Sequence, residues 1–200
     1  AIFEKHGIRN IGYWVPVDNK ENKLVYVVSY PGREAREKSW KGFFADPDWT
    51  RAYQASTKDG ALVKKVVSQF LTPTDYTPDL KIEAGDPVRL FELRTYTTRE
   101  GKLADLHKRF REHTCAIFEK HGITNILYCD PMKDQKGAGT TLVYLIAHKD
   151  AAARKASWGE FVKDPAWQAA RKASVADGPI LVKGGVKSEL LEPVDYSPMK

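Results

Sequence analysis

Charged and aromatic side chains share one face of a short extended segment, residues 88–98. Glu92, Arg94 and Tyr96 point to one side there and Phe91 and Leu93 to the other, which is the period of a β-strand. An isolated charge inside a sheet is costly, so these two charges must be paired or solvated. We prefer a salt bridge at a sheet interface. The alternative is an anion clamp, in which Arg94 holds a carboxylate or enolate of a small substrate.

Two histidines occupy matched places in the sequence. His6 and His121 each stand directly before a glycine, within the repeated letters "AIFEKHGI". A cation at the C-terminus of a helix suits the macrodipole and the last carbonyl groups, which is the structural interpretation. The functional alternative is a general base or ligand at the mouth of a cleft, because His121 continues the apolar stripe of its helix.

Further polar side chains also recur in pairs. A tyrosine in a strand fills the core and still offers its hydroxyl group. An asparagine is disfavoured in strands, so its repetition indicates a specific hydrogen bond to the backbone or to a ligand. In a catalytic interpretation His121 is the base, and Arg94 or Tyr144 stabilises developing negative charge. The other candidate ligand-binding residues are His6, Asn10, Tyr26, Asn125, Glu92 and Tyr96.

The elements that must position these residues follow in a regular order. After the strand at 88–98, apolar residues recur at helical spacing over 103–121, and Gly122 is a good helix stop. Two strands follow, then a helix that begins after Asp150, a second short helix opened by "DPAW", and a last strand. The order β-α-β-β-α-β predicts a ferredoxin-like unit.

The first part of the chain repeats the second at an offset well above 100 residues, which indicates domain duplication. We assign residues 1–79 to a first unit, 80–87 to a linker and 88–200 to a second, complete unit. The matched stretches are 6–16 with 121–131, 24–30 with 142–148, 39–56 with 157–174, and 73–78 with 193–198.

The first unit lacks counterparts of residues 88–115, which form the first strand and most of the first helix. In a ferredoxin-like sheet the first strand lies in the interior, so its loss leaves backbone groups unpaired. We therefore expect the chain to be the ordered or surviving part of a longer protein. The alternative is that another segment or another chain supplies the strand.

Three motifs resemble the NIPSNAP family of the dimeric α/β-barrel superfamily: "FELRTYTTREGKL", "KHGI" and "SW…DPAW". The last two recur in the first unit as "KHGI" and "SW…DPDW". Phe91 stands where a tyrosine is commoner. The resemblance implies an α+β fold of tandem ferredoxin-like units, whose four-stranded sheets meet in a barrel within the chain or between chains. The superfamily includes cofactor-free monooxygenases, isomerases, decarboxylases and haem-binding proteins, but the fold alone supplies no activity.

Composition narrows the class of protein. The 200 residues are 42% hydrophobic and 29% charged, with a net charge of +6, as in an ordinary globular chain. We expect no nucleic-acid partner, because basic residues form no run, and no membrane span. Phosphate loops, nucleophile elbows and metal-binding cysteine or histidine motifs are missing. The compartment stays undetermined, with periplasmic or secreted localisation open for a bacterial protein.

Three functions follow from these features. We prefer a self-associating module that scaffolds or binds a small molecule, with tryptophan-bearing helices and open strand edges as contact surfaces. The alternative is a cofactor-free enzyme of monooxygenase, isomerase or decarboxylase type, acting on a small carbonyl-bearing or aromatic substrate. Neither needs a metal or cofactor. The third hypothesis is haem binding through His121.

Overall fold

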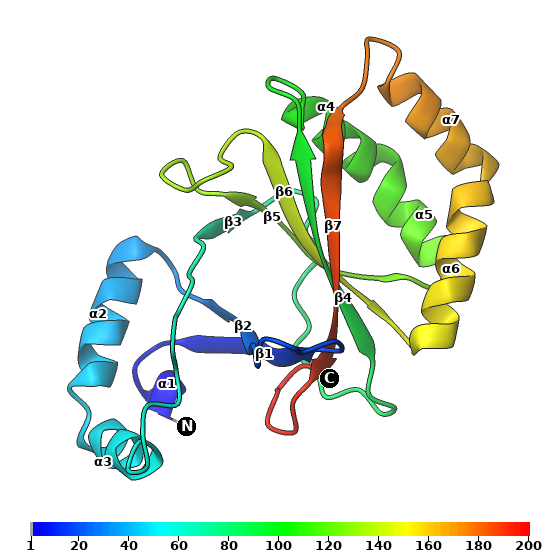
Figure 1. The fold of residues 1–200 in the computed structure, drawn as a ribbon. Helices are drawn as coiled ribbons and strands as arrows, with labels where there is room; N and C mark the ends of the chain where they lie inside the picture. The colour runs from blue at the N-terminus through cyan, green and yellow to red at the C-terminus, as the bar shows by residue number, and fades with distance from the viewer. Residues whose placement is uncertain (1) are drawn as a thin grey trace.

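One curved antiparallel sheet organises the molecule. The computed structural model describes residues 2–200, and within them seven strands pair in the order β2-β1-β7-β4-β6-β5-β3 (Figure 1). The strands are β1 (Arg9–Pro16), β2 (Val25–Ser29), β3 (Leu71–Pro73), β4 (Leu90–Thr98), β5 (Thr124–Pro131), β6 (Thr141–His148) and β7 (Leu181–Pro193).

The second unit has the predicted ferredoxin-like order. Its first strand, β4, lies in the interior between β6 and β7, and β5 pairs with the other edge of β6. Asp150 caps α6 (Ala151–Lys163) and Asp164 caps α7 (Pro165–Ser174), each through its side chain. The helices of this unit cover one face of the sheet (Figure 1).

The first helix of the second unit differs from the regular helix expected over 103–121. It consists of α4 (Leu103–Arg109), a π-helical turn η1 (Phe110–Thr114) and α5 (Cys115–Lys120). The Thr114 hydroxyl donates a hydrogen bond of 3.1 Å to the Arg109 carbonyl oxygen. The wider turn moves the apolar stripe by one residue, so Phe110 and Phe118 both face the core.

The first unit is shorter, as the repeat predicted. Its described residues, 2–79, form α1 (Ile2–Lys5), β1, β2, α2 (Arg33–Phe44), α3 (Pro47–Ser56) and β3, and include no counterparts of β4 and α4. Its last strand, β3, has 3 residues, whereas β7 has 13. The difference has a direct cause, because β7 pairs along its length with β4 and the residues before β3 have no such partner.

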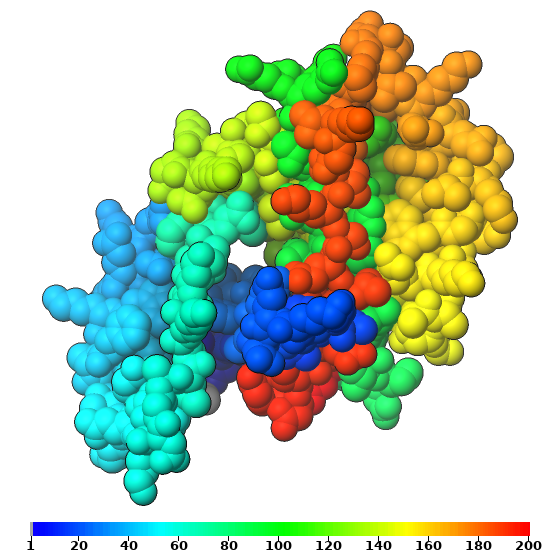
Figure 2. Space-filling view, in the orientation of Figure 1, coloured from blue at the N-terminus to red at the C-terminus, as the bar shows by residue number. Residues whose placement is uncertain are grey.

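The two units join in a barrel within this single chain. β1 and its counterpart β5 each pair with the last strand of the other unit: β1 pairs with β7, and β5 pairs with β3. The sheet ends at β2 and β3, and Figure 2 shows an opening beside the residues that precede β3 (cyan). The part of the chain that the structure describes therefore forms an α/β barrel of the dimeric type, with one strand missing between β2 and β3.

Two apolar cores follow from the alternation of side chains along the strands. Trp14, Phe91 and Leu145 pack inside the barrel. On the other face of the sheet, Tyr144 and Ile146 pack against the helices of the second unit. Glu92, Arg94 and Tyr96 lie on this helix-facing side, since they alternate with Phe91.

The boundaries assigned at 79 and 88 stay a prediction. Within residues 80–87 the structure has neither helix nor strand. The segment is attached to the C-terminus by two backbone hydrogen bonds, from the Gly85 amide to the Lys200 carbonyl (3.0 Å) and from the Lys200 amide to the Glu83 carbonyl (3.2 Å).

Candidate functional site

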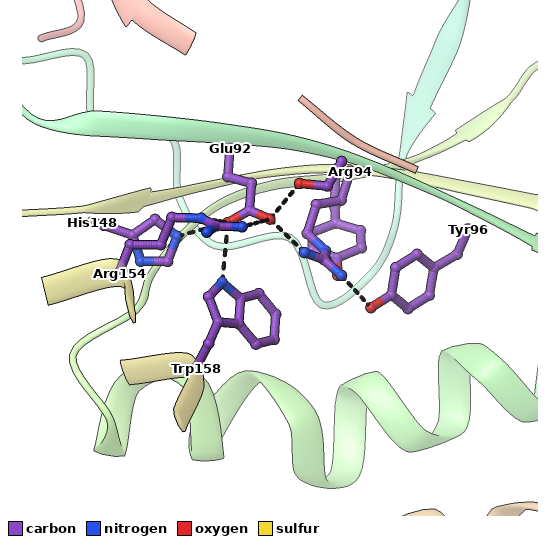
Figure 3. A network of polar contacts seen from close by, with 8 residues as sticks. Glu92, Arg94, Tyr96, His148, Arg154 and Trp158 are labelled. Carbon is purple, nitrogen blue, oxygen red and sulfur yellow. Dashed lines mark hydrogen bonds and ion pairs between the residues drawn. The ribbon is translucent and has the colours of Figure 1, made fainter. Parts of the chain in front are cut away.

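A buried carboxylate organises the polar contacts between the sheet and α6. Glu92 is fully buried on β4 and is surrounded by hydrogen-bond donors (Figure 3). Its donors are Arg154 Nε (2.7 Å) and Nη2 (3.1 Å), Trp158 Nε1 (3.0 Å), Ser188 Oγ (2.6 Å) and Arg94 Nη1, and His148 Nε2 lies 3.1 Å from Oε2. Every lone pair of this carboxylate is therefore engaged within the fold.

Burial and hydrogen bonding act on Glu92 in opposite directions. Burial alone raises the pKa of a carboxyl group, because it disfavours the charged form. Hydrogen bonds from His148, Arg154 and Ser188, together with the charge of Arg94, overcome that effect and hold the pKa of Glu92 well below its usual range. Glu92 is thus an anion at neutral pH and a poor candidate for a general acid.

Each of the three nitrogen atoms of the Arg94 guanidinium group donates one internal hydrogen bond. Nε donates to Tyr144 Oη at 2.8 Å, Nη2 donates to Tyr96 Oη at 3.1 Å, and Nη1 donates to Glu92. The guanidinium carbon lies 4.5 Å from the ring centroid of Trp158, at cation–π distance. This geometry favours the ion pair over the anion clamp, because few donor positions are left for a substrate.

Tyr144 lies deep in the aromatic core of the second unit. Its ring stacks on Tyr128 with centroids 5.3 Å apart and meets Tyr96 edge to face at 5.2 Å. Burial raises the pKa of the Tyr144 hydroxyl well above its ordinary value, even though Arg94 opposes the shift. The phenol therefore stays protonated and can stabilise charge only through hydrogen bonds.

His121 lies at the end of α5 and contacts the helix pair instead of this network. Its Nε2 atom is 2.8 Å from Asp164 Oδ2, and Lys120 Nζ is 2.7 Å from the same oxygen. Asp164 also accepts the Ala166 amide at 2.8 Å, so one carboxylate caps α7 and anchors α5. Within residues 2–200, no hydrogen bond or ion pair joins His121 to Arg94 or Tyr144.

The first unit repeats this arrangement. His6 Nε2 is 2.6 Å from Asp46 Oδ2, and Lys5 Nζ is 2.8 Å from it. Asp46 caps α3 by accepting the Asp48 amide at 2.8 Å. Both histidines therefore connect the end of one helix to the N-cap of another, which favours the structural interpretation for His6 and His121.

In each unit, the repeated asparagine accepts a hydrogen bond from a tyrosine three residues later in the same strand. Tyr13 Oη donates to Asn10 Oδ1 at 2.5 Å, and Tyr128 donates to Asn125 in the same way. Asn125 Nδ2 additionally donates to the Cys115 carbonyl oxygen at 2.9 Å, so it fastens β5 to the helix. The Tyr26 ring stacks on Tyr13 with a centroid distance of 5.7 Å. These contacts explain the matched residues by packing and local hydrogen bonds.

The structure thus brings Glu92, Arg94, Tyr96 and Tyr144 together and leaves His121 in a separate contact. The residues that sequence reasoning missed in the network are His148, Arg154, Trp158 and Ser188. A signal for some of them was present, because the Arg–Trp spacing on α6 recurs as Arg36 and Trp40 on α2. The catalytic and ligand-binding assignments themselves stay predictions.

Two hollows accompany these contacts. A cavity of about 40 Å³ lies inside the barrel and has apolar walls that include Trp14, Leu93 and Leu127. A shallow surface groove of about 600 Å³ lies beside His6 and is flanked by Lys38 and Lys41. Residues 2–200 contain no cluster of His, Cys, Asp and Glu that could hold a metal ion. Among the same residues, no helix has the length and apolar character to cross a bilayer.

Several solved structures are similar to this chain. A candidate monooxygenase from Fusobacterium nucleatum has a TM-score of 0.60 at 12% identity, covering 94% of this chain and 77% of its own. A second candidate monooxygenase, from Lactobacillus acidophilus, has a TM-score of 0.54 at 12% identity, with coverages of 96% and 84%. At these identities the likeness shows the fold alone.

Family membership comes from the sequence. A NIPSNAP family protein from Agrobacterium tumefaciens is 24% identical, with a TM-score of 0.49 over 61% of this chain and all (100%) of its own. Among curated proteins, none matches significantly. The NIPSNAP family profile matches residues 1–78 and 91–198, which is both units. The chain therefore belongs to the NIPSNAP family and carries two tandem NIPSNAP units.

Proposed function

We propose that this protein is a self-associating binding module, in preference to an enzyme. The observation that carries the proposal is the uncovered helix pair of the first unit. In the second unit, α7 packs against α4 and η1, and Ala170 is buried there. In the first unit, α3 has no buried residue, and Ala52, the counterpart of Ala170, is exposed.

The uncovered surface is aromatic. Phe43 and Trp49 pack with ring centroids 4.5 Å apart, and Trp49 meets Tyr53 at 5.6 Å. Phe44 and Tyr53 are 61% and 52% exposed at the edge of this cluster. An apolar surface of this kind is rare on a monomer and typical of a contact with another chain. A second copy that covers α2 and α3 would bury it.

The contacts of the candidate catalytic residues also support a binding module. Glu92, Arg94 and Tyr144 satisfy one another, and His121 is held by Asp164. An acid–base or oxyanion site needs polar groups directed at a substrate cavity. The cavity inside the barrel has apolar walls, so its chemistry suits a small apolar molecule better than a reacting carbonyl compound.

Self-association can be tested by sedimentation equilibrium. We expect Phe44→Asp to weaken the dimer about 10-fold or more, because it places a charge in the aromatic contact surface. The matched control is Val162→Asp, since Val162 is the aligned residue of α6 and is 54% exposed. A wild-type chain that stays monomeric, or an equal loss in the two variants, would contradict the proposal.

Ligand binding can be tested with xenon, an apolar probe that enters dry cavities. We expect xenon under pressure to shift the methyl NMR signals of Leu93, Leu127 and Leu145, which line the cavity. Leu127→Phe fills part of the space and should reduce these shifts at least several-fold. Unchanged methyl signals in the wild-type protein would show that the barrel interior binds no apolar probe.

A further inference from the structure

Three hydrogen-bond donors of the first unit are gathered without an acceptor. Trp40 Nε1 and Tyr30 Oη are buried and, within residues 2–200, have no hydrogen-bond partner. Arg36 lies above Trp40, with its guanidinium carbon 5.8 Å from the ring centroid, and above Phe70 at 4.8 Å. Buried donors are nearly always satisfied in folded proteins, so this cluster needs an explanation.

The repeat identifies the missing acceptor. Tyr30, Arg36 and Trp40 align with His148, Arg154 and Trp158, and all three of the latter contact Glu92 in the second unit. Ser68 aligns in the same way with Ser188, the fourth contact. The first unit thus has hydrogen-bond donors at the positions that bind a carboxylate in the second unit, with Tyr30 in place of a histidine. The strand that would carry that carboxylate is not among residues 2–200.

The three groups lie within electrostatic reach of one another. Burial raises the pKa of Tyr30, while the Trp40 indole and the Arg36 guanidinium oppose that shift. The two side chains are close, but the contact between Tyr30 Oη and Trp40 Nε1 does not meet the distance and angle of a hydrogen bond, and neither atom has another partner among residues 2–200. A carboxylate between them would accept from both and would neutralise Arg36, which is a charge-assisted arrangement.

Two open strand edges flank this cluster. β2, the counterpart of β6, pairs with β1 on one side and is a free end of the sheet on the other. The residues before β3 form no strand, and four of them have strongly exposed apolar side chains. Their exposed fractions are 71% for Leu62, 65% for Val63, 66% for Val66 and 80% for Val67. In the second unit, β4 covers the matching edges of β6 and β7.

We infer that the seam between β2 and residues 61–71 is a docking site for an extended strand that carries a glutamate, bound through its carboxylate by Tyr30, Arg36 and Trp40. The strand has the alternating pattern of residues 88–98. This inference is independent of self-association through α2 and α3. The ligand of these three hydrogen-bond donors is then a negatively charged side chain on the docked strand.

The second unit also predicts the register. Glu92 lies opposite Ile146 and Leu190, whose counterparts are Val28 and Phe70. The docked glutamate should therefore lie between Val28 and Phe70. A residue two positions later would lie opposite Tyr26, the counterpart of Tyr144, where an arginine could repeat the contact of Arg94 with Tyr144.

A synthetic peptide with the sequence of residues 88–98 is a direct probe. A fluorescent label and a lysine tail for solubility allow its binding to the 200-residue chain to be measured by anisotropy. We expect one peptide to bind per chain and to slow hydrogen exchange at Val27, Val66 and Val67. The same peptide with glutamine in place of the glutamate should bind about 10-fold more weakly, because a charge-assisted hydrogen bond is lost.

Variants of the chain test the receptor. Trp40→Phe removes the indole donor but keeps an aromatic ring, and should weaken the peptide about 10-fold. Trp167→Phe, the same substitution on α7 of the second unit, is the matched control and should leave binding unchanged. The glutamine peptide tests recognition of the carboxylate with the wild-type chain. The inference can therefore still be tested if the Trp40→Phe variant folds poorly.

Three results would overturn the inference. They are no peptide binding, equal binding of the glutamate and glutamine peptides, and displacement of the peptide by free glutarate at similar concentration. The last would show that the site takes a free carboxylate and needs no strand. Sedimentation of the same samples reports self-association separately, so failure of one proposal is distinguishable from failure of the other.

Discussion

Glu92→Gln is expected to lower the free energy of unfolding by about 3–5 kcal/mol. The substitution keeps the shape of the side chain but removes the charge that Arg94 and Arg154 share. The amide keeps one acceptor oxygen, but its NH2 group then faces donors that contacted the other oxygen, and the guanidinium groups of Arg94 and Arg154 lose their shared counter-charge. Urea denaturation followed by tryptophan fluorescence measures the loss directly.

Glu189→Gln is the control for this variant. Glu189 pairs with Lys23 at the partly exposed barrel surface, where an ion pair contributes less than about 1 kcal/mol. The two variants should therefore differ several-fold in their effect. Similar losses would mean that the network around Glu92 contributes little beyond a surface ion pair.

The effect of Glu92 should also depend on pH. The pKa of Glu92 is lowered in the folded protein, so its contribution to stability is complete above the unfolded value of about 4.3 and is lost as the pH falls through the folded value. The difference between wild type and Glu92→Gln should therefore shrink in acid. A difference that grows as the pH falls would contradict the assigned charge state.

The sequence predicted the sheet well because its signals are local. Strict alternation in residues 88–98 placed Glu92, Arg94 and Tyr96 on one face, and the internal repeat showed that the first unit lacks a strand. The partners of those charges could not be predicted in the same way. Arg154 and Ser188 come from elements 62 and 96 residues away from Glu92, and only the fold brings them to it.

Two other features of the fold could not be predicted from the sequence, for physical reasons. The π-helical turn at Phe110–Thr114 changes the helical period locally, and apolar spacing alone described the segment as one regular helix. The short β3 depends on a missing neighbour, because a strand forms only where another strand pairs with it. The local β-propensity of residues 61–73 does not indicate whether a neighbouring strand is present. Comparison of the two repeats does indicate that it is missing.

Asp164→Ala is expected to lower the melting temperature by roughly 4–8 °C, since a single side chain caps α7 and holds Lys120 and His121. Asp164→Asn should retain much of the cap, because asparagine also accepts backbone amides, and lose the ion pairs. Scanning calorimetry of the two variants separates these contributions. Equal melting temperatures for Asp164→Asn and the wild type would show that the ion pairs with Lys120 and His121 are unimportant.

The aligned variant Asp46→Ala tests whether the surrounding helix layer matters. Asp46 makes the same contacts with Lys5 and His6, but its helix, α3, lies outside the core and has no buried residue. We expect a smaller fall in melting temperature than for Asp164→Ala. Hydrogen bonds from Lys120 and then His121 lower the pKa of Asp164, and Lys5 and then His6 do the same for Asp46. The stabilisation that each of these two carboxylates gives to the folded state is therefore complete above the unfolded pKa of about 3.9. It is lost as the pH falls and the folded carboxylates become protonated. In dilute, monomeric protein, a larger loss for Asp46→Ala than for Asp164→Ala would contradict this ranking. Self-association through α2 and α3 covers α3, so the two losses should become more similar as the protein concentration rises.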